Sequence, residues 1–89
     1  MKYEDYKKNM KEFKYSIDYM DEALTNLHNA GYNFDHTMTY CGSDIPTMMS
    51  VMIRAQIAYM NTMLEGAKKA YEYYEEHCRE IVEDWPEDE

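Results

Sequence analysis

The chain is short and strongly acidic: it has 89 residues, with 18 Asp and Glu against 9 Lys and Arg, for a formal net charge of −9. A chain of this length forms one small domain, and such domains often rely on a partner to complete their core. The negative charge repels nucleic acid and anionic membranes, so we exclude direct binding to either and expect a basic protein surface as the partner. We find no signal peptide and no apolar run of membrane-spanning length, which predicts a cytoplasmic protein.

The first predicted element is a helix over about residues 3–29. Apolar side chains recur there in alternating steps of three and four residues, the pattern of a helix that packs along one narrow seam. These residues are Tyr3, Tyr6, Met10, Phe13, Ile17, Met20, Leu24 and Leu27. Gly31 follows, and we predict that it ends the helix in the left-handed conformation that glycine adopts without strain.

A loop is predicted over residues 31–44, because the periodic apolar pattern lapses there. The segment holds His36 and Cys41, and it ends in Ser43 and Asp44 before Pro46. In that arrangement a side-chain oxygen caps the following helix and a proline occupies its first turn. Loops of this length in small domains are often functional, but nothing in the segment assigns a role to it.

The second predicted helix covers about residues 45–84 and ends before Pro86, which leaves an acidic tail at 86–89. Its apolar series again alternates steps of three and four without a miss. The series is Ile53, Ile57, Met60, Leu64, Ala67, Tyr71, Tyr74, Cys78, Ile81 and Trp85. Because this register passes through Gly66 unchanged, we predict one long helix and hence an all-α helical hairpin. A turn at Gly66 would give a three-helix bundle instead.

The lengths of the two helices predict exposed apolar surface. At 1.5 Å per residue, the second helix would extend roughly 20 Å beyond the first. It also carries a second apolar stripe, wider than one antiparallel neighbour can cover, at Met48, Met52, Ala55 and Tyr59 with Met49 and Met63 beside them. We therefore expect two copies to dimerise into a helical bundle. The predicted core or dimer seam consists of Ile53, Ile57, Met60, Leu64, Tyr71 and Tyr74.

Metal binding and catalysis lack support in the sequence. Helical bundles build di-iron sites from Glu-x-x-His motifs, and none of the three histidines has a Glu three residues before it. His77 and Cys78 are adjacent on a predicted helix, so their side chains point in different directions and do not chelate one ion easily. We predict no catalytic residue, no metal site and no cofactor, and free thiols at Cys41 and Cys78.

The acidic residues are concentrated at the end of the chain, where residues 67–89 hold 9 acids and 3 bases. Along the predicted helix they recur every three or four residues at its negative end, where like charges and the helix dipole both oppose them. Sequences tend to break such local rules at working sites, although a solubilising helix face is the other interpretation. The predicted partner-binding residues are Glu72, Glu76, Glu80, Glu83 and Asp84, with the tyrosines Tyr73, Tyr15 and Tyr19.

Size and acidity make the chain similar to the small proteins with which phages block host defence, including anti-CRISPR and anti-restriction inhibitors. The resemblance implies a nucleic-acid-binding defence effector as the partner and the cytoplasm of a bacterial host as the place of action. The resemblance is one of size and composition, and no sequence motif supports it. The alternative hypothesis is a homodimeric helical scaffold or assembly protein with no nucleic-acid-related target.

Overall fold

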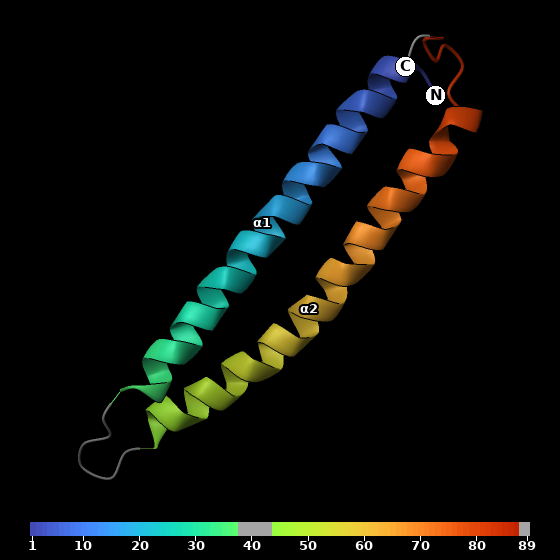
Figure 1. The fold of residues 1–89 in the computed structure, drawn as a ribbon. Coiled ribbons are helices and arrows are strands. Elements are labelled where there is room, and N and C mark those ends of the chain that lie inside the picture. Colours follow the sequence, from blue (N-terminus) through green and yellow to red (C-terminus); the bar gives the residue numbers. More distant parts are fainter. Residues whose placement is uncertain (38–43, 88–89) are drawn as a thin grey trace.

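The computed structural model describes residues 1–37 and 44–87 and shows an antiparallel helical hairpin (Figure 1). Helix α1 spans Tyr3–Asp35, helix α2 spans Ile45–His77, and a short 3-10 helix, η1, follows at Cys78–Glu80. The described residues contain no β-strand. The predicted all-α hairpin is therefore confirmed.

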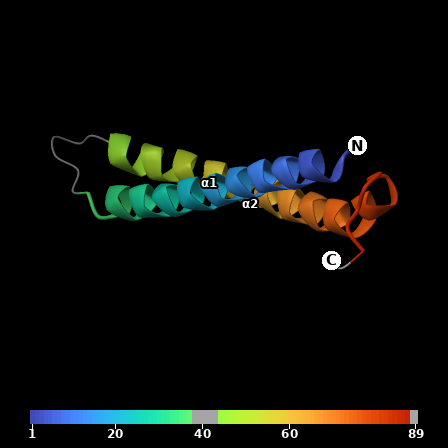
Figure 2. The same cartoon turned by 90° about the horizontal axis from the view of Figure 1, so that it is seen from above.

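The molecule is a rod, 68 Å long and 17 by 16 Å across. Its radius of gyration is 20.0 Å, whereas a compact chain of this length has a radius of roughly 12 Å. The first residues of the chain and the last described ones, 82–87, lie at the same end of the rod (Figure 1). Figure 2 shows that the helices cross at a shallow angle, as expected when apolar residues repeat every 3.5 positions and the helices wind around each other to keep them in contact.

The core of this hairpin is one line of side chains between the two helices. Few residues are fully buried, because each helix has a single neighbour and solvent reaches the seam from both sides. The buried apolar side chains are Tyr3, Ile17, Leu64, Cys78 and Val82, joined by the polar Ser50. Within the predicted seam, Leu64 is buried, Ile53, Ile57, Met60 and Tyr71 are half-buried, and Tyr74 is 45% exposed.

The prediction that Gly31 ends the first helix is wrong. Helix α1 continues to Asp35, and Gly31 is a buried helical residue on the seam. A Cβ atom added at this position would lie 3.4 Å from Cγ2 of Ile53, at the limit of ordinary van der Waals contact, so Ile53 of α2 packs directly against the Gly31 backbone. Just beyond Asp35, the last helical residue, the His36 ring Nδ1 and the Thr37 hydroxyl donate to the carbonyl oxygens of Tyr32 and Asn33 at 2.8 and 2.7 Å.

Helix α2 continues through Gly66, as the unbroken register predicts, but it does not reach residue 84. The α-helix ends at His77, so α1 and α2 have 33 residues each and the predicted 20 Å overhang is absent. The seam register also fails after Cys78. Because the backbone tightens into η1 and then turns, Val82 is buried and the predicted seam residue Ile81 is 61% exposed.

The start of α2 is only partly covered by the described residues. Asp44 is the residue that precedes the helix, its side chain makes no capping hydrogen bond, and Pro46 lies in the first turn as predicted. The predictions for Cys41 and Ser43 lie outside the described residues.

Candidate protein-binding surfaces

The segment after η1 folds back onto the start of α1 and caps it. The Oδ1 of Asp84 accepts a hydrogen bond of 2.6 Å from the backbone N–H of Tyr3, the first residue of α1. The Glu83 carboxylate lies 3.0 Å from Nζ of Lys2 and 3.9 Å from the amino terminus. The backbone N–H of Glu83 donates to the Met1 carbonyl at 3.0 Å. Residues 81 positions apart in the chain therefore hold the two termini together.

Trp85 anchors this terminal contact through its ring. It meets Tyr3 edge-on, with ring centroids 5.0 Å apart, and lies 5.2 Å from the ring of Tyr6. The guanidinium of Arg79 lies over the Trp85 ring at 5.4 Å. Burial of large aromatic surface in such geometry stabilises the contact beyond the area it removes from water.

The capping contact accounts for two of the acids that the sequence places at the unfavourable end of the second predicted helix, Glu83 and Asp84. In an antiparallel hairpin the C-terminal end of α2 lies beside the N-terminal end of α1. That end of α1 carries unpaired N–H groups and a positive partial charge, so a carboxylate stabilises it. Glu83 and Asp84, two of the predicted partner-binding residues, thus make intramolecular contacts. They lie outside the α-helix that was expected to present them.

Three of the predicted acids remain directed to solvent. Glu72 and Glu76 lie in the last turns of α2 and Glu80 lies in η1, and all three are exposed. Among the described residues, none of these carboxylates has a Lys or Arg nitrogen within 4.0 Å; the nearest basic group is Nε2 of His77, 3.9 Å from Glu76. These three residues form what we call the acidic face.

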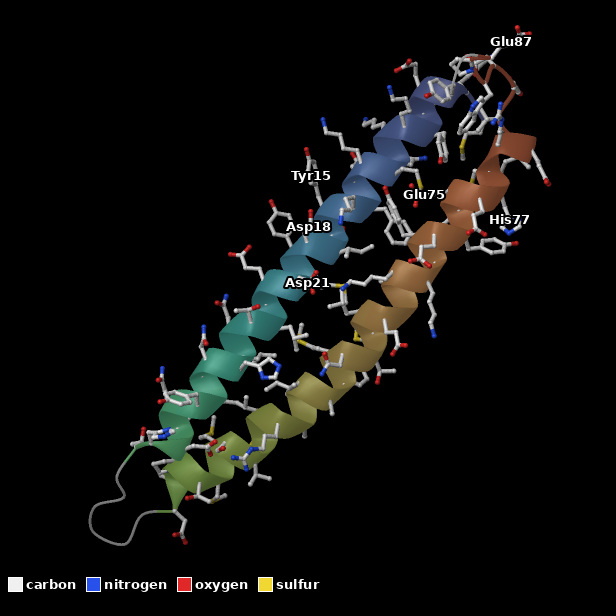
Figure 3. The ribbon with its side chains drawn as sticks, viewed as in Figure 1. Tyr15, Asp18, Asp21, Glu75, His77 and Glu87 are labelled. Atoms are coloured by element: carbon white, nitrogen blue, oxygen red, sulfur yellow. The ribbon has the colours of Figure 1, made fainter. Side chains whose placement is uncertain are left out.

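The predicted tyrosines fall into two separate groups. Tyr73 is 60% exposed and stacks on the ring of His77, with centroids 4.3 Å apart, at the same end of α2 as the acidic face. Tyr15 and Tyr19 are 51% and 71% exposed on α1. Figure 3 shows Tyr15 on the side of α1 that points away from α2. The structure therefore brings Tyr73 together with the acids, and it places the α1 tyrosines on a different surface.

The two long edges of the hairpin differ in charge. One edge, which we call the charged edge, carries ion pairs that join the helices. Nη2 of Arg54 lies 2.8 and 2.7 Å from the two carboxylate oxygens of Asp35, and Nζ of Lys68 lies 3.7 Å from Asp21. The hydroxyl of Ser50, 1% exposed, also donates to Asp35, and this hydrogen bond, reinforced by Arg54, holds the pKa of the Asp35 carboxyl below its usual value of 3.8.

The opposite edge carries no ionised side chain at the corresponding heptad positions. These positions recur every seven residues on the side of the seam away from the ion pairs. In the middle of the rod this set, which we call the uncharged edge, consists of Ala23, Ala30, Met49, Gln56, Met63 and Ala70; the same spacing continues to Asn9, Ser16 and His77 toward the chain ends. Met49 and Met63 are 37% and 47% exposed. The sequence pattern identifies these two methionines as part of an apolar stripe, but the contrast between the edges emerges only once the two helices are paired.

The outer face of α2 adds to the uncharged edge over the first half of the helix. Met48, Val51, Met52 and Tyr59 there are between 57% and 65% exposed. The predicted second apolar stripe is thus left uncovered by α1. Between residues 45 and 64, α2 contains only one charged residue, Arg54, and that residue lies on the charged edge.

An apolar hollow of about 280 Å³ opens near the termini. Its lining residues are Met1, Tyr6, Asn9, Met10, Phe13, Tyr74, Cys78 and Ile81. Partial burial raises the pKa of the Tyr6 phenol, and the neighbouring Cys78 and Glu75 act in the same direction. Cys78 is a free, buried thiol. The hollow contains no convergent set of polar groups of the kind that orients a substrate.

The described residues contain no cluster of three or more His, Cys, Asp or Glu side chains that could hold a metal ion. Neither α1 nor α2, as far as the described residues go, is long and apolar enough to cross a membrane. Comparison with protein-family models, with curated proteins and with solved structures finds no match to this chain. Functional inference therefore depends on the surfaces described above.

Proposed function

We propose that this protein is a non-catalytic protein-binding module whose acidic face docks onto a basic, nucleic-acid-binding protein and blocks it. In this hypothesis it acts in the cytoplasm of a bacterial host as an anti-CRISPR or anti-restriction inhibitor, or as a DNA mimic. The observation that carries the proposal is the row of exposed carboxylates at Glu72, Glu76 and Glu80, which no described Lys or Arg neutralises. Such a row attracts a surface that normally contacts phosphates.

The rigidity of the row supports the same proposal. Glu72 and Glu76 are one helical turn apart, on a helix whose end is anchored by the terminal contact, so their Cβ atoms are held about 5–6 Å apart. Because the backbone that bears these charges is already ordered, only the side chains lose conformational entropy when a partner binds, which favours affinity. Tyr73, exposed at the same end of α2, supplies the large contact area at low entropic cost that is typical of protein interfaces.

The experiment is a competition assay with a panel of bacterial CRISPR effectors and restriction enzymes. Each is incubated with labelled DNA and increasing amounts of the protein, at low and high salt. The proposal predicts that one class of effector loses DNA binding, and that inhibition weakens as salt rises. The triple variant with Gln at Glu72, Glu76 and Glu80 should inhibit at least about tenfold more weakly, because each lost charge pair at an interface weakens binding substantially.

A matched control removes the same number of charges from another surface. Glu4, Glu12 and Glu22 are exposed on α1, and changing all three to Gln makes the net charge less negative by the same amount. This control should inhibit like the native protein. Equal inhibition by both triple variants would show that only the overall charge matters, and no inhibition of any effector would contradict the proposal.

A second candidate function is a homodimeric helical scaffold with no nucleic-acid-related target. The observation that favours it is the apolar surface of α2 that the single chain leaves uncovered. In this hypothesis the acidic face only keeps the assembly in solution. Self-association without inhibition of any DNA-binding protein would favour the scaffold.

A further inference from the structure

The single hairpin exposes far more surface than a compact protein of its mass. Its accessible surface is 6995 Å², whereas a compact monomer of 10.7 kDa exposes roughly 5,500 Å². The surplus, roughly 1,500 Å² for each chain, is comparable to the area that stable dimers bury in total. Along the seam, most of the apolar residues of α2 are only half-buried.

The two edges differ in their ability to accept a second hairpin. A second hairpin that packed on the charged edge would bury the ion pairs of Arg54 with Asp35 and of Lys68 with Asp21. Removing these charges from water is unfavourable unless they gain new partners. On the uncharged edge, a second hairpin would cover Met49 and Met63 and the small side chains of Ala23 and Ala30. Small residues let helices approach closely, and methionine adapts to fill the gaps between them.

We infer that a second copy of this chain packs against the uncharged edge to form a four-helix bundle, with α2 antiparallel to the partner's α2 about a two-fold axis near Gln56. Gln56 lies midway between the two exposed methionines of this edge, Met49 and Met63. The axis therefore pairs Met49 of each copy with Met63 of the other, and it sets each Gln56 beside its own counterpart. In such an isologous interface every contact is made twice.

The distribution of charge along the hairpin favours the antiparallel over the parallel orientation of the two α2 helices. Residues 67–89 hold 9 acids against 3 bases, while α2 from residue 45 to 64 holds only Arg54. A parallel pair of α2 helices would set the two acidic faces side by side, where like charges repel. In the antiparallel pair each acidic face extends past the start of the partner's α2. The two acidic faces are then separated by more than one Debye length, about 8 Å, so their repulsion is screened. The dimer buries the uncharged edge of each hairpin and leaves both acidic faces exposed to solvent.

The first test is a charge swap at the axis. Gln56→Glu and Gln56→Lys each place like charges opposite each other, so analytical ultracentrifugation should show dimerisation weakened about tenfold or more in either variant alone. An equimolar mixture of the two should recover dimers, because opposite charges then meet. Since Gln56 is exposed in the single hairpin, folding of the monomer should be unaffected, which circular dichroism checks. The matched control, Tyr19→Lys on the outer face of α1, should dimerise normally.

The second test measures orientation. A spin label at Lys69→Cys, with Cys41→Ser and Cys78→Ala in the background, reports one inter-copy distance by electron paramagnetic resonance. The antiparallel axis at Gln56 predicts about 40 Å, since each label lies 13 residues from the axis at 1.5 Å per residue. A distance under about 20 Å would mean parallel helices and would overturn the orientation.

A chain that stays monomeric at all concentrations would overturn the dimer, as would dimers that neither Gln56 variant weakens. A monomer that binds a different protein through Met49 and Met63 would also overturn it. None of these measurements involves a basic partner, so their outcome is independent of the proposed inhibition.

Discussion

Replacing Asp84 with Ala should destabilise the protein, although the change removes an acid from a strongly acidic chain end. The substitution deletes the carboxylate that accepts the N–H of Tyr3 at 2.6 Å. Loss of an N-cap acceptor costs about 0.5–2 kcal/mol. Loss of a negative charge at the positive end of a helix adds about 0.3–1 kcal/mol. Because one carboxylate supplies both effects, they do not add in full, and we expect a total of about 1–2 kcal/mol.

The assay is thermal unfolding followed by circular dichroism at one fixed protein concentration, since self-association would otherwise change the apparent stability. For a domain of this size, about 1–2 kcal/mol lowers the Tm by roughly 5–15 °C. The matched control is Glu76→Gln, which also removes one acid from the same end of the rod. Glu76 is exposed between Glu72 and Glu80 near the negative end of α2, so its loss should leave the Tm unchanged or raise it slightly.

Opposite signs for these two variants are the expected result. If Asp84→Ala raised the Tm as Glu76→Gln does, both acids would be unfavourable charges at the end of α2. The terminal contact would then not stabilise the fold, and the capping argument would be refuted. A loss of stability in both variants would instead indicate that Glu76 has a favourable contact.

Three further predictions test the seam and its edge. Gly66→Ala should raise the free energy of unfolding by about 1 kcal/mol in urea titrations, because Gly66 is helical and a methyl group added there would meet no atom within 4 Å; a loss of stability would show that α2 needs flexibility there. Leu64→Ala should lower the free energy of unfolding by about 2–5 kcal/mol, since Leu64 is 5% exposed. A change under about 1 kcal/mol would mean that the seam is loosely packed. In the folded protein the pKa of Asp35 lies below its unfolded value of about 3.8. Ionised Asp35 therefore stabilises the fold at pH values above about 3.8, and this stabilisation is lost as the pH falls through the folded-state pKa. The difference in urea midpoint between native protein and Asp35→Asn should therefore be largest near neutral pH and shrink below about pH 4; a constant difference would contradict this linkage.

The sequence was most informative where local periodicity and packing agree. The alternating steps of three and four predicted two helices facing each other along one seam, and Ile17 and Leu64 are buried on it. The unbroken register predicted that α2 passes through Gly66. Such patterns succeed because a helix that buries one stripe needs the same spacing whatever its partner is.

Predictions failed where a residue's role depends on its neighbour in space. Gly31 was expected to end a helix, but it lies within one because Ile53 of α2 packs against it. Local propensity contains no information about that approach. The end of α2 was placed at residue 84, because the same apolar series cannot show that Trp85 turns back to meet Tyr3.

The amino-acid sequence alone determined that this protein is an acidic, all-helical hairpin with one apolar seam, because composition and spacing are properties of the chain itself. Only the tertiary structure decided which acids are available to a partner. Pairing the helices antiparallel brings Asp84 to the N-terminus of α1 and leaves Glu72 and Glu76 in solvent. The same pairing separates a charged edge from an uncharged one, since each edge combines residues of both helices that lie far apart in the chain.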